Sequence, residues 1–145
     1  HAALAAELDR VRAKHGVAIL YDCHSIRSYI PFLFDGVLPD FNIGTNMGTT
    51  CDPMIEAATR AVCEAADGYS SILNGRFKGG WTTRHYGRPE INQHAIQMEL
   101  AQSAYLSAEA APWTYDAARS AKLRLHLTSI LEKLAELAPT LRGTS

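Results

Sequence analysis

Near the start of the chain, hydrophobic positions follow first a helical and then a strand pattern. Leu4, Leu8 and Val11 recur at intervals of three and four residues, which places them on one face of a helix over residues 1–16. Gly16 is a suitable helix terminator, because glycine adopts the left-handed conformation that closes many helices. The apolar run GVAILY, residues 16–21, then predicts a buried strand.

The same two patterns recur further along the chain. Asp52 and Pro53 are favourable residues for a helix start, and the helix that they predict ends at Gly68. Residues 69–77 (YSSILNGRF) predict a short strand that enters a turn. Residues 94–100 (HAIQMEL) predict a further strand, because residue types alternate there with period two.

The last part of the chain is predicted to be helical. Residues 101–111 (AQSAYLSAEAA) are expected to continue as a helix after the preceding strand. A final helix follows Pro112 and carries a stripe of apolar residues: Leu123, Leu127, Ile130, Leu131, Leu134 and Leu137. This stripe is interpreted as core, with a partner-binding face as the alternative.

This order of elements predicts an α/β fold, in which a mixed, mostly parallel sheet is flanked by helices. A length of 145 residues fits a single domain over residues 1–145. Residues 31–51, which are rich in Gly, Pro, Asn and Thr, are expected to form a long ordered loop or a pair of short turns, and long loops in compact domains are frequently functional. Residues 77–89 are another glycine-rich stretch.

The composition argues against several classes of partner. Lys and Arg number 14 against 15 Asp and Glu, so the formal net charge is −1 and gives no reason to expect nucleic acid or an anionic membrane. No apolar run approaches the roughly 20 residues that cross a bilayer. The three cysteines form no CxxC pair and the chain shows no secretion signal, so we expect a reducing, cytoplasmic location.

The tetrapeptide DCHS, residues 22–25, follows the first predicted strand and is the first candidate site. Open α/β folds bind ligands at the carboxyl ends of their strands. A neutral imidazole there is a good zinc ligand, so His24 is a candidate metal ligand, with Asp22 and Ser25 as supporting side chains. The alternative is a histidine that simply bonds a backbone carbonyl.

Two further groups of residues are candidates. Glu99 lies between Met98 and Leu100 in an apolar strand, where partial desolvation would raise its pKa and suit a general base. The alternative is a glutamate in the first turn of the next helix. The stretch LNGRFKGGWTTRHYG sets three cationic side chains among glycines, either as a clamp for carboxylates or as a basic surface turn: Arg76, Lys78 and Arg84.

Four motifs, read in order, resemble the N-formylglutamate amidohydrolase (deformylase) family. These motifs are YDCHSIRSYIP, LFDGVLPDFNIGT, NGRFKGGWTTRHYGRP and HAIQMELAQSAYL. The resemblance implies a fold like that of the zinc carboxypeptidases and aspartoacylase. It also implies zinc as cofactor and hydrolysis of N-formyl-L-glutamate to formate and L-glutamate, the closing step of one route of histidine degradation.

The resemblance also implies roles for individual residues. His24 matches the position of a zinc ligand, and Glu99 matches the residue that activates the zinc-bound water. A dianionic substrate needs cationic groups, for which Arg76 and Arg84 are the best candidates, with Asn74 and Lys78 behind them.

One departure from the family pattern concerns length. Family members are considerably longer and carry an upstream metal-binding segment that nothing before His24 matches, so this chain is expected to be a partial domain resembling the C-terminal half of the enzyme. Alone, it is expected to be inactive, to bind zinc weakly or not at all, and to associate with itself or with a partner segment. The alternatives are a related N-acyl amino acid amidohydrolase, or a non-catalytic fragment that serves as a binding or structural module.

Overall fold

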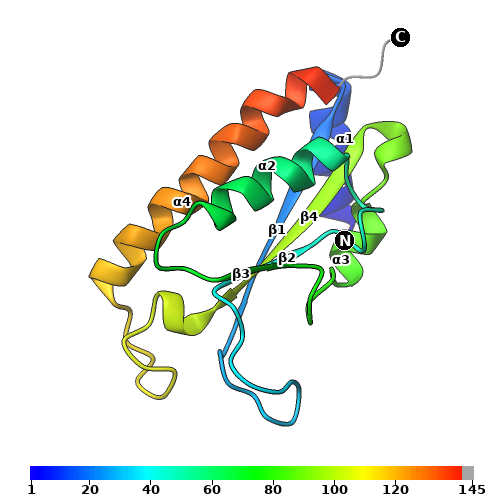
Figure 1. Ribbon diagram of the computed structural model, residues 1–145. Coiled ribbons are helices and arrows are strands. Elements are labelled where there is room, and N and C mark those ends of the chain that lie inside the picture. Colours follow the sequence, from blue (N-terminus) through cyan, green and yellow to red (C-terminus); the bar gives the residue numbers. More distant parts are fainter. Residues whose placement is uncertain (142–145) are drawn as a thin grey trace.

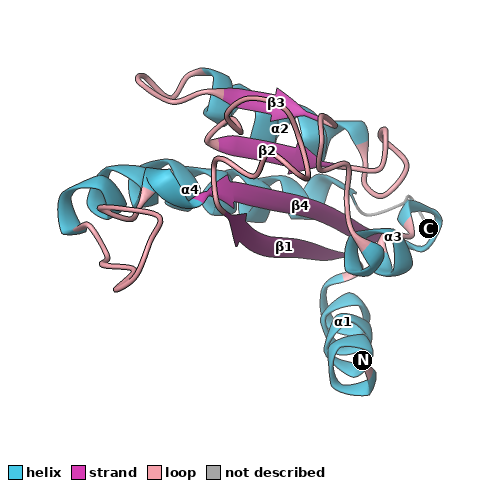
Figure 2. Ribbon diagram, turned by 90° about the horizontal axis from the view of Figure 1, so that it is seen from below, coloured by secondary structure: helices cyan, strands magenta, loops and turns pink. Residues whose placement is uncertain are grey.

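A computed structural model describes residues 1–141, in which four strands form one sheet with helices on both faces (Figure 1). The strand order is β1-β4-β2-β3, with β1 at one edge (Figure 2). The strands span Ala18–Ile26 (β1), Phe41–Gly44 (β2), Ser71–Leu73 (β3) and Gln93–Ala101 (β4). β1 runs parallel to β4 and β2 runs parallel to β3, whereas β2 and β4 are antiparallel. The predicted mixed, mostly parallel sheet is therefore confirmed.

Two helix ends follow from local residues. α1 (Ala2–His15) ends at Gly16, whose φ of 77° is the left-handed conformation that glycine adopts without steric cost. α2 (Pro53–Glu64) begins after Asp52, whose side chain accepts a hydrogen bond from the backbone N–H of Met54. Both sequence predictions are confirmed at these ends.

One face of the sheet carries the main hydrophobic core. α2 and α4 (Ala117–Leu137) cover this face, and α4 crosses it diagonally (Figure 1). The largest fully buried apolar side chains all belong to this core: Phe41, Ile43, Ile55, Ile96, Met98 and Ile130. Leu131 was predicted to share the apolar stripe of α4, but it is 49% exposed, because its side chain lies beside the contact face and not on it.

The other face of the sheet is covered by α1 and by α3 (Trp81–Tyr86). Leu8 of α1 and Tyr86 of α3 pack with Ala18 in a second, smaller core, with Leu20 at its margin. This cover stops short of the carboxyl end of β1, so His24 on this face is exposed, whereas Asp22 is half-buried against Thr83 of α3. Short 3₁₀ turns complete the chain at Pro89–Ile91, Gln102–Ala104 and Ala138–Leu141.

Several sequence predictions are wrong in their detail. β1 continues past the predicted apolar run to Ile26, so the DCHS motif forms its carboxyl-terminal part. The loop predicted over residues 31–51 contains β2, and the glycine-rich stretch 77–89 contains α3. The helix predicted over residues 101–111 does not form.

The carboxylate of Glu109 explains this last difference. It accepts hydrogen bonds from the backbone N–H groups of Ser28 at 2.7 Å and Ser103 at 2.8 Å. These bonds hold the segment as a folded loop against the end of β1. Among residues 1–141, no helix is both long enough and apolar enough to span a membrane.

Candidate active site

The register of β1 against β4 brings the two main candidate residues together. His24 is the Cα partner of Glu99, and Asp22 is the partner of Gln97. Partnered residues of parallel strands point to the same face, and residues two apart in a strand share a face. All four side chains therefore lie on one face of the sheet, beyond the part that α1 covers.

A cavity of about 520 Å³ opens at this place. It is lined by His24, Arg76, Phe77, Lys78, Gly79, Gly80, Arg84, Gln97 and Glu99. Three of these side chains are cationic and one is a carboxylate, so the cavity has an excess of positive charge. The cationic residues Arg76, Lys78 and Arg84 are all exposed, whereas Glu99 is buried.

Asp22 holds the ring of His24. One carboxylate oxygen of Asp22 lies 2.9 Å from Nε2 of His24, and the other accepts a hydrogen bond of 2.9 Å from the hydroxyl of Thr83. A carboxylate only accepts hydrogen bonds, so Nε2 carries a proton in this pair, and in a neutral imidazole Nδ1 then keeps a lone pair. Thr83 is fully buried, and its bond ties α3 to β1 directly behind the candidate histidine.

The loop of residues 77–80 forms the opposite wall and is held by close backbone contacts. The N–H of Gly80 donates to Oε1 of Gln97 at 2.6 Å, and the carbonyl of Lys78 accepts from the N–H of Asn46, also at 2.6 Å. A Cβ on Gly44 would lie only 2.5 Å from the backbone nitrogen of Gly79. The end of β2 therefore meets this loop backbone to backbone, which only glycine permits.

The environment of Glu99 favours its protonated form. Burial raises the pKa of this carboxyl, while the neighbouring His24 opposes that effect and Asp22 adds to it. A carboxylate with a raised pKa is a stronger base than an exposed one, and a proton acceptor that works near neutral pH needs this property. Among the residues singled out from the sequence, Glu99 is the one with the environment of a general base.

Each of the two arginines of the cavity uses part of its guanidinium group in a hydrogen bond to a backbone carbonyl. Arg84 donates to the carbonyl of Gly79 at 2.7 Å, so part of its guanidinium braces the loop. Arg76 donates through Nε to the carbonyl of Leu33 at 3.1 Å. Each guanidinium has five N–H donors, so both keep donors that are available to a ligand.

Two predicted site residues are not brought into the cavity. Ser25 alternates with His24 along β1 and so points to the opposite face, where its hydroxyl lies 2.7 Å from that of Tyr105. The amide of Asn74 is used within the fold: its Oδ1 accepts from the N–H of Thr45 at 2.9 Å, and its Nδ2 donates to the hydroxyl of Thr45 at 2.8 Å. These bonds show that Asn74 holds the turn after β3 in place.

The described residues do not fit a zinc site on their own. Among residues 1–141, no group of three or more His, Cys, Asp and Glu side chains is placed to hold a metal ion, whereas a catalytic zinc takes three protein ligands. His94, two positions from Ile96 in β4, faces α2, where its Nδ1 accepts from the N–H of Asp52 at 3.3 Å. His85 is stacked on Trp81, with ring centroids 4.2 Å apart. Neither histidine lines the cavity that contains His24.

Sequence reasoning missed two residues that shape the site, Gln97 and Thr83. Gln97 shares the face of Glu99 by the period-two pattern, so a signal for it was present in HAIQMEL. Thr83 carried no such signal, because the helix α3 and its packing on β1 are set by tertiary contacts.

The family model of the N-formylglutamate amidohydrolases matches residues 1–106. The chain belongs to this family. The N-formylglutamate deformylase of Pseudomonas aeruginosa is 54% identical to it over 134 residues, and that of Pseudomonas putida is 52% identical over 134 residues. Each match covers 92% of this chain and 50% of the relative, so the chain spans about half the length of these curated relatives. The resemblance carried by the four motifs is confirmed.

A solved structure shows the same fold. The crystal structure of N-formylglutamate amidohydrolase from Ralstonia eutropha JMP134 matches with a TM-score of 0.78 at 23% sequence identity. The match covers 93% of this chain and 50% of that chain. The arrangement of strands and helices described above is thus that of about half of a known amidohydrolase.

Proposed function

We propose that this chain is one half of an N-formylglutamate amidohydrolase and supplies its general base and its substrate-binding cations. The observation that carries the proposal is the composition of one cavity. The lining of this cavity includes the buried acid Glu99, His24, and three cationic side chains that lie more than 50 residues away from His24 in the sequence. The family membership and the names of the curated relatives support this substrate.

The proposed substrate, N-formyl-L-glutamate, carries two carboxylates, and the cavity has the complementary charge. Arg76 and Arg84 offer planar donor pairs that match a carboxylate, and Lys78 offers a point charge. Two such contacts would fix both ends of the glutamate moiety and leave its formyl group directed at Glu99.

Hydrolysis breaks the bond between the formyl carbon and the amide nitrogen, and adds the elements of water to release formate and L-glutamate. In the proposed reaction, Glu99 takes one proton from the attacking water and passes it to the leaving amine. Its raised pKa suits both transfers, because the carboxyl must first accept this proton and then return it. Asp22 keeps His24 in one ring orientation beside the reacting groups.

A requirement for zinc is a separate part of the proposal. The described residues supply His24 but not a complete ligand set, so we assign no step of the reaction to a metal. If zinc is required, its other ligands come from the half of the relatives that this chain does not match. Such an ion would polarise the formyl oxygen and lower the pKa of a bound water. The lone pair on Nδ1 of His24 is then the donor that this chain contributes.

We further propose that the protein acts in the cytoplasm, where it catalyses the closing step of one route of histidine degradation. The three cysteines, which are free thiols, are consistent with a reducing compartment: Cys23, Cys51 and Cys63. The pathway is inferred from the reaction that the names of the relatives describe.

A hybrid enzyme tests the function. These 145 residues replace the matched half of the P. aeruginosa deformylase, and formate release from N-formyl-L-glutamate is measured. The hybrid is expected to be active, and Glu99→Gln is expected to lower kcat by about 10²- to 10⁴-fold with little change in KM. Glu90→Gln, an exposed acid outside the cavity, is the control and is expected to leave kcat unchanged. A folded but inactive hybrid would contradict the proposal, as would a Glu99→Gln hybrid with normal kcat.

The cationic groups are tested in the same hybrid with two substrates. Arg76→Lys or Arg84→Lys loses a bidentate carboxylate contact, which corresponds to roughly a 10- to 100-fold rise in KM. The rise is expected to be smaller for N-formyl-L-glutamine, in which a neutral amide replaces the side-chain carboxylate. Equal losses on both substrates for both variants would show that these arginines only hold the loop.

A further inference from the structure

The loop of residues 28–38, which lies between β1 and β2, is closed at its base. The backbone N–H of Leu38 donates to the carbonyl of Ser28 at 2.8 Å. Ser28 is buried, and the carboxylate of Glu109 accepts hydrogen bonds of 2.7 Å from both its backbone N–H and its hydroxyl. Ile30 and Leu38 are buried as well. The loop is therefore a compact unit that is anchored to the rest of the fold at its two ends.

The same loop meets the cationic wall of the cavity through two neighbouring contacts. The carbonyl of Leu33 accepts the hydrogen bond from Nε of Arg76. One residue further along each segment, the ring of Phe34 meets the ring of Phe77 edge to face, with centroids 6.3 Å apart and planes at 78°. Arg76 and Phe77 both line the cavity. One polar and one aromatic contact thus join this loop to the wall that carries Arg76.

Backbone carbonyls leave a different edge of each arginine free for a ligand. A guanidinium holds a carboxylate with two parallel hydrogen bonds along either of two edges, Nη1 with Nη2 or Nε with Nη2. In Arg76 the Leu33 carbonyl occupies Nε, so the pair that remains wholly free is Nη1 with Nη2. In Arg84 the Gly79 carbonyl occupies Nη1, so the free pair is Nε with Nη2. Arg76 is therefore set to bind end-on and Arg84 to bind side-on.

We propose that the loop of residues 28–38 determines specificity at this site, and that Phe34 is a positioning residue that keeps Arg76 end-on to one carboxylate of the substrate. The side chain of Arg76 is exposed, and a long exposed side chain loses many rotamers when it binds a ligand in one geometry. The bond to Leu33 removes part of that freedom before the substrate arrives. The ring contact between Phe34 and Phe77 holds the two segments at the separation that this bond needs. The role rests on the proposed function only for the identity of the ligand, an N-formyl amino acid with two carboxylates.

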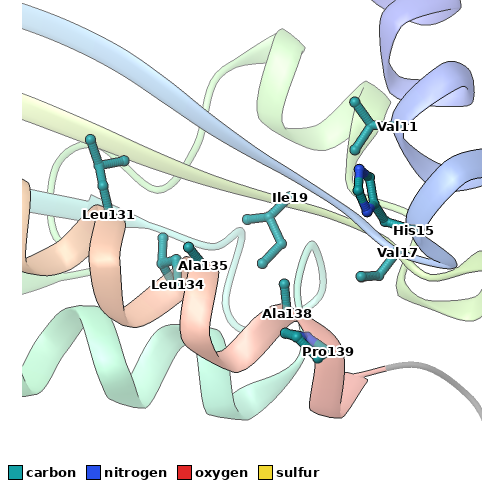
Figure 3. A pocket seen from close by; sticks show the side chains of 9 residues that line it. All are labelled: Val11, His15, Val17, Ile19, Leu131, Leu134, Ala135, Ala138 and Pro139. Carbon is teal, nitrogen blue, oxygen red and sulfur yellow. The ribbon is translucent and has the colours of Figure 1, made fainter.

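An apolar groove away from the cavity provides a distant control position. This groove of about 380 Å³ lies between α1, the start of β1 and α4 (Figure 3). Ile19, which lines it, is an odd number of residues from His24 along β1 and so points to the opposite face of the sheet. Leu131 also lines it and is 49% exposed. Truncation of Leu131 therefore removes apolar packing without touching the wall that carries Arg76.

Steady-state kinetics on the hybrid enzyme test the role of Phe34. Phe34→Ala is expected to raise KM for N-formyl-L-glutamate by about 3- to 10-fold, which corresponds to the loss of one aromatic pair, with little change in kcat. Phe32→Ala is the matched control, because Phe32 belongs to the same loop but is 85% exposed. Phe32→Ala and Leu131→Ala are both expected to leave KM unchanged. An unchanged KM in Phe34→Ala, or an equal rise in Phe32→Ala, would overturn the inference.

A double-mutant cycle shows whether Phe34 acts through Arg76. In the Arg76→Lys background, Phe34→Ala is expected to raise KM no further, because lysine has no second donor group with which to bind both Leu33 and a carboxylate. In the Arg84→Lys background, the full rise is expected. The same rise in both backgrounds would mean that Phe34 only supports the fold, and the inference would be wrong.

Two substrate analogues identify the carboxylate that is affected. N-formyl-L-glutamine lacks the side-chain carboxylate, and N-formyl-L-isoglutamine lacks the α-carboxylate. Phe34→Ala is expected to raise KM for one of these analogues and to leave it unchanged for the other, from which the partner of Arg76 has been removed. Arg76→Lys is expected to show the same preference. Equal rises on both analogues in Phe34→Ala would contradict a role in carboxylate recognition.

Hydrogen exchange at Nε of Arg76 gives a readout that does not depend on activity. It is followed by NMR on the hybrid with isotopically labelled arginine, and this N–H is expected to exchange at least about threefold faster in Phe34→Ala than in Phe32→Ala. An inactive hybrid with this difference would contradict the proposed function alone, and an active hybrid without it would contradict this inference alone. If Phe34→Ala does not fold, Phe34→Leu, which keeps apolar bulk but not the aromatic edge, takes its place under the same criteria.

Discussion

Gly44 offers a direct test of how the candidate site is held together. This glycine ends β2 and contacts the backbone of the loop at residues 77–80, which forms one wall of the cavity. A Cβ at position 44 would lie 2.5 Å from the nitrogen of Gly79, 2.8 Å from the carbonyl carbon of Lys78 and 3.0 Å from the Cα of Gly79. Ordinary contacts begin at 3.4 Å, so Gly44→Ala must move β2 and the loop apart by about 0.9 Å.

The cost follows from what that movement breaks. The loop is fixed by two hydrogen bonds of 2.6 Å, from Asn46 to the Lys78 carbonyl and from Gly80 to Gln97, and a shift of about 0.9 Å stretches both to the limit of a hydrogen bond. Each lost bond costs about 0.5–1.5 kcal/mol, and overpacking adds about 1–3 kcal/mol. Gly44→Ala is therefore expected to lower the free energy of unfolding by roughly 2–6 kcal/mol.

Urea denaturation of the 145-residue chain measures this, with Gly75→Ala as the matched control. A Cβ on Gly75 would also be too close to a neighbour, at 2.6 Å, but that neighbour is the end of the Ile72 side chain, which is 40% exposed and free to rotate away. The control is expected to cost less than about 1 kcal/mol. Equal losses for the two variants, or a loss below about 0.5 kcal/mol for Gly44→Ala, would refute the idea that a backbone contact fixes the loop.

Three further predictions concern the core, the support of the histidine and the buried acid. Ile130→Ala is expected to cost about 2–5 kcal/mol of unfolding free energy, because its side chain is fully buried, whereas Leu131→Ala on the exposed side of α4 is expected to cost under about 1 kcal/mol; urea denaturation compares them. Thr83→Val keeps the side-chain shape but removes the hydrogen bond to the carboxylate of Asp22, so a loss of about 1.5–3 kcal/mol is expected by the same measurement. Because burial raises the pKa of Glu99, the folded state keeps this proton to higher pH than the unfolded chain, so the resulting stabilisation is complete below pH about 4.3 and is lost as pH rises through the raised pKa. Glu99→Gln should therefore gain stability relative to the unmodified chain between pH 4 and pH 7. A difference in stability that does not change with pH would contradict this.

Elements with strong local signals could be predicted from the sequence. Asp52 and Pro53 define the start of α2, because a capping carboxylate and a preset φ act within one turn. Gly16 ends α1 for the same kind of local reason. The period-two pattern of residues 94–100 identified β4, and it also placed Gln97 and Glu99 on one face. The family membership followed from motifs that need no structure to read.

Elements that depend on distant partners were missed. β2 has four buried residues and no alternation, because both of its faces are covered, so no polar face marked it as a strand. The polar half of β1, from Asp22 to Ser25, is a strand only because β4 pairs with it. The loop after Gln102 displaced a predicted helix because the carboxylate of Glu109 bonds the backbone N–H of distant Ser28 as well as that of nearby Ser103.

The sequence alone therefore determined which residue types are available for the chemistry: an acid in a strand, a histidine after an apolar run and a basic, glycine-rich turn. Only the tertiary structure decided which of them meet. His24 and Glu99 are brought together by the register of two parallel strands that are distant in the chain, and the basic loop reaches them through the backbone contact at Gly44. The edge position of β1 was likewise decided by pairing, because each strand's hydrogen bonds are satisfied by partners that local sequence does not specify.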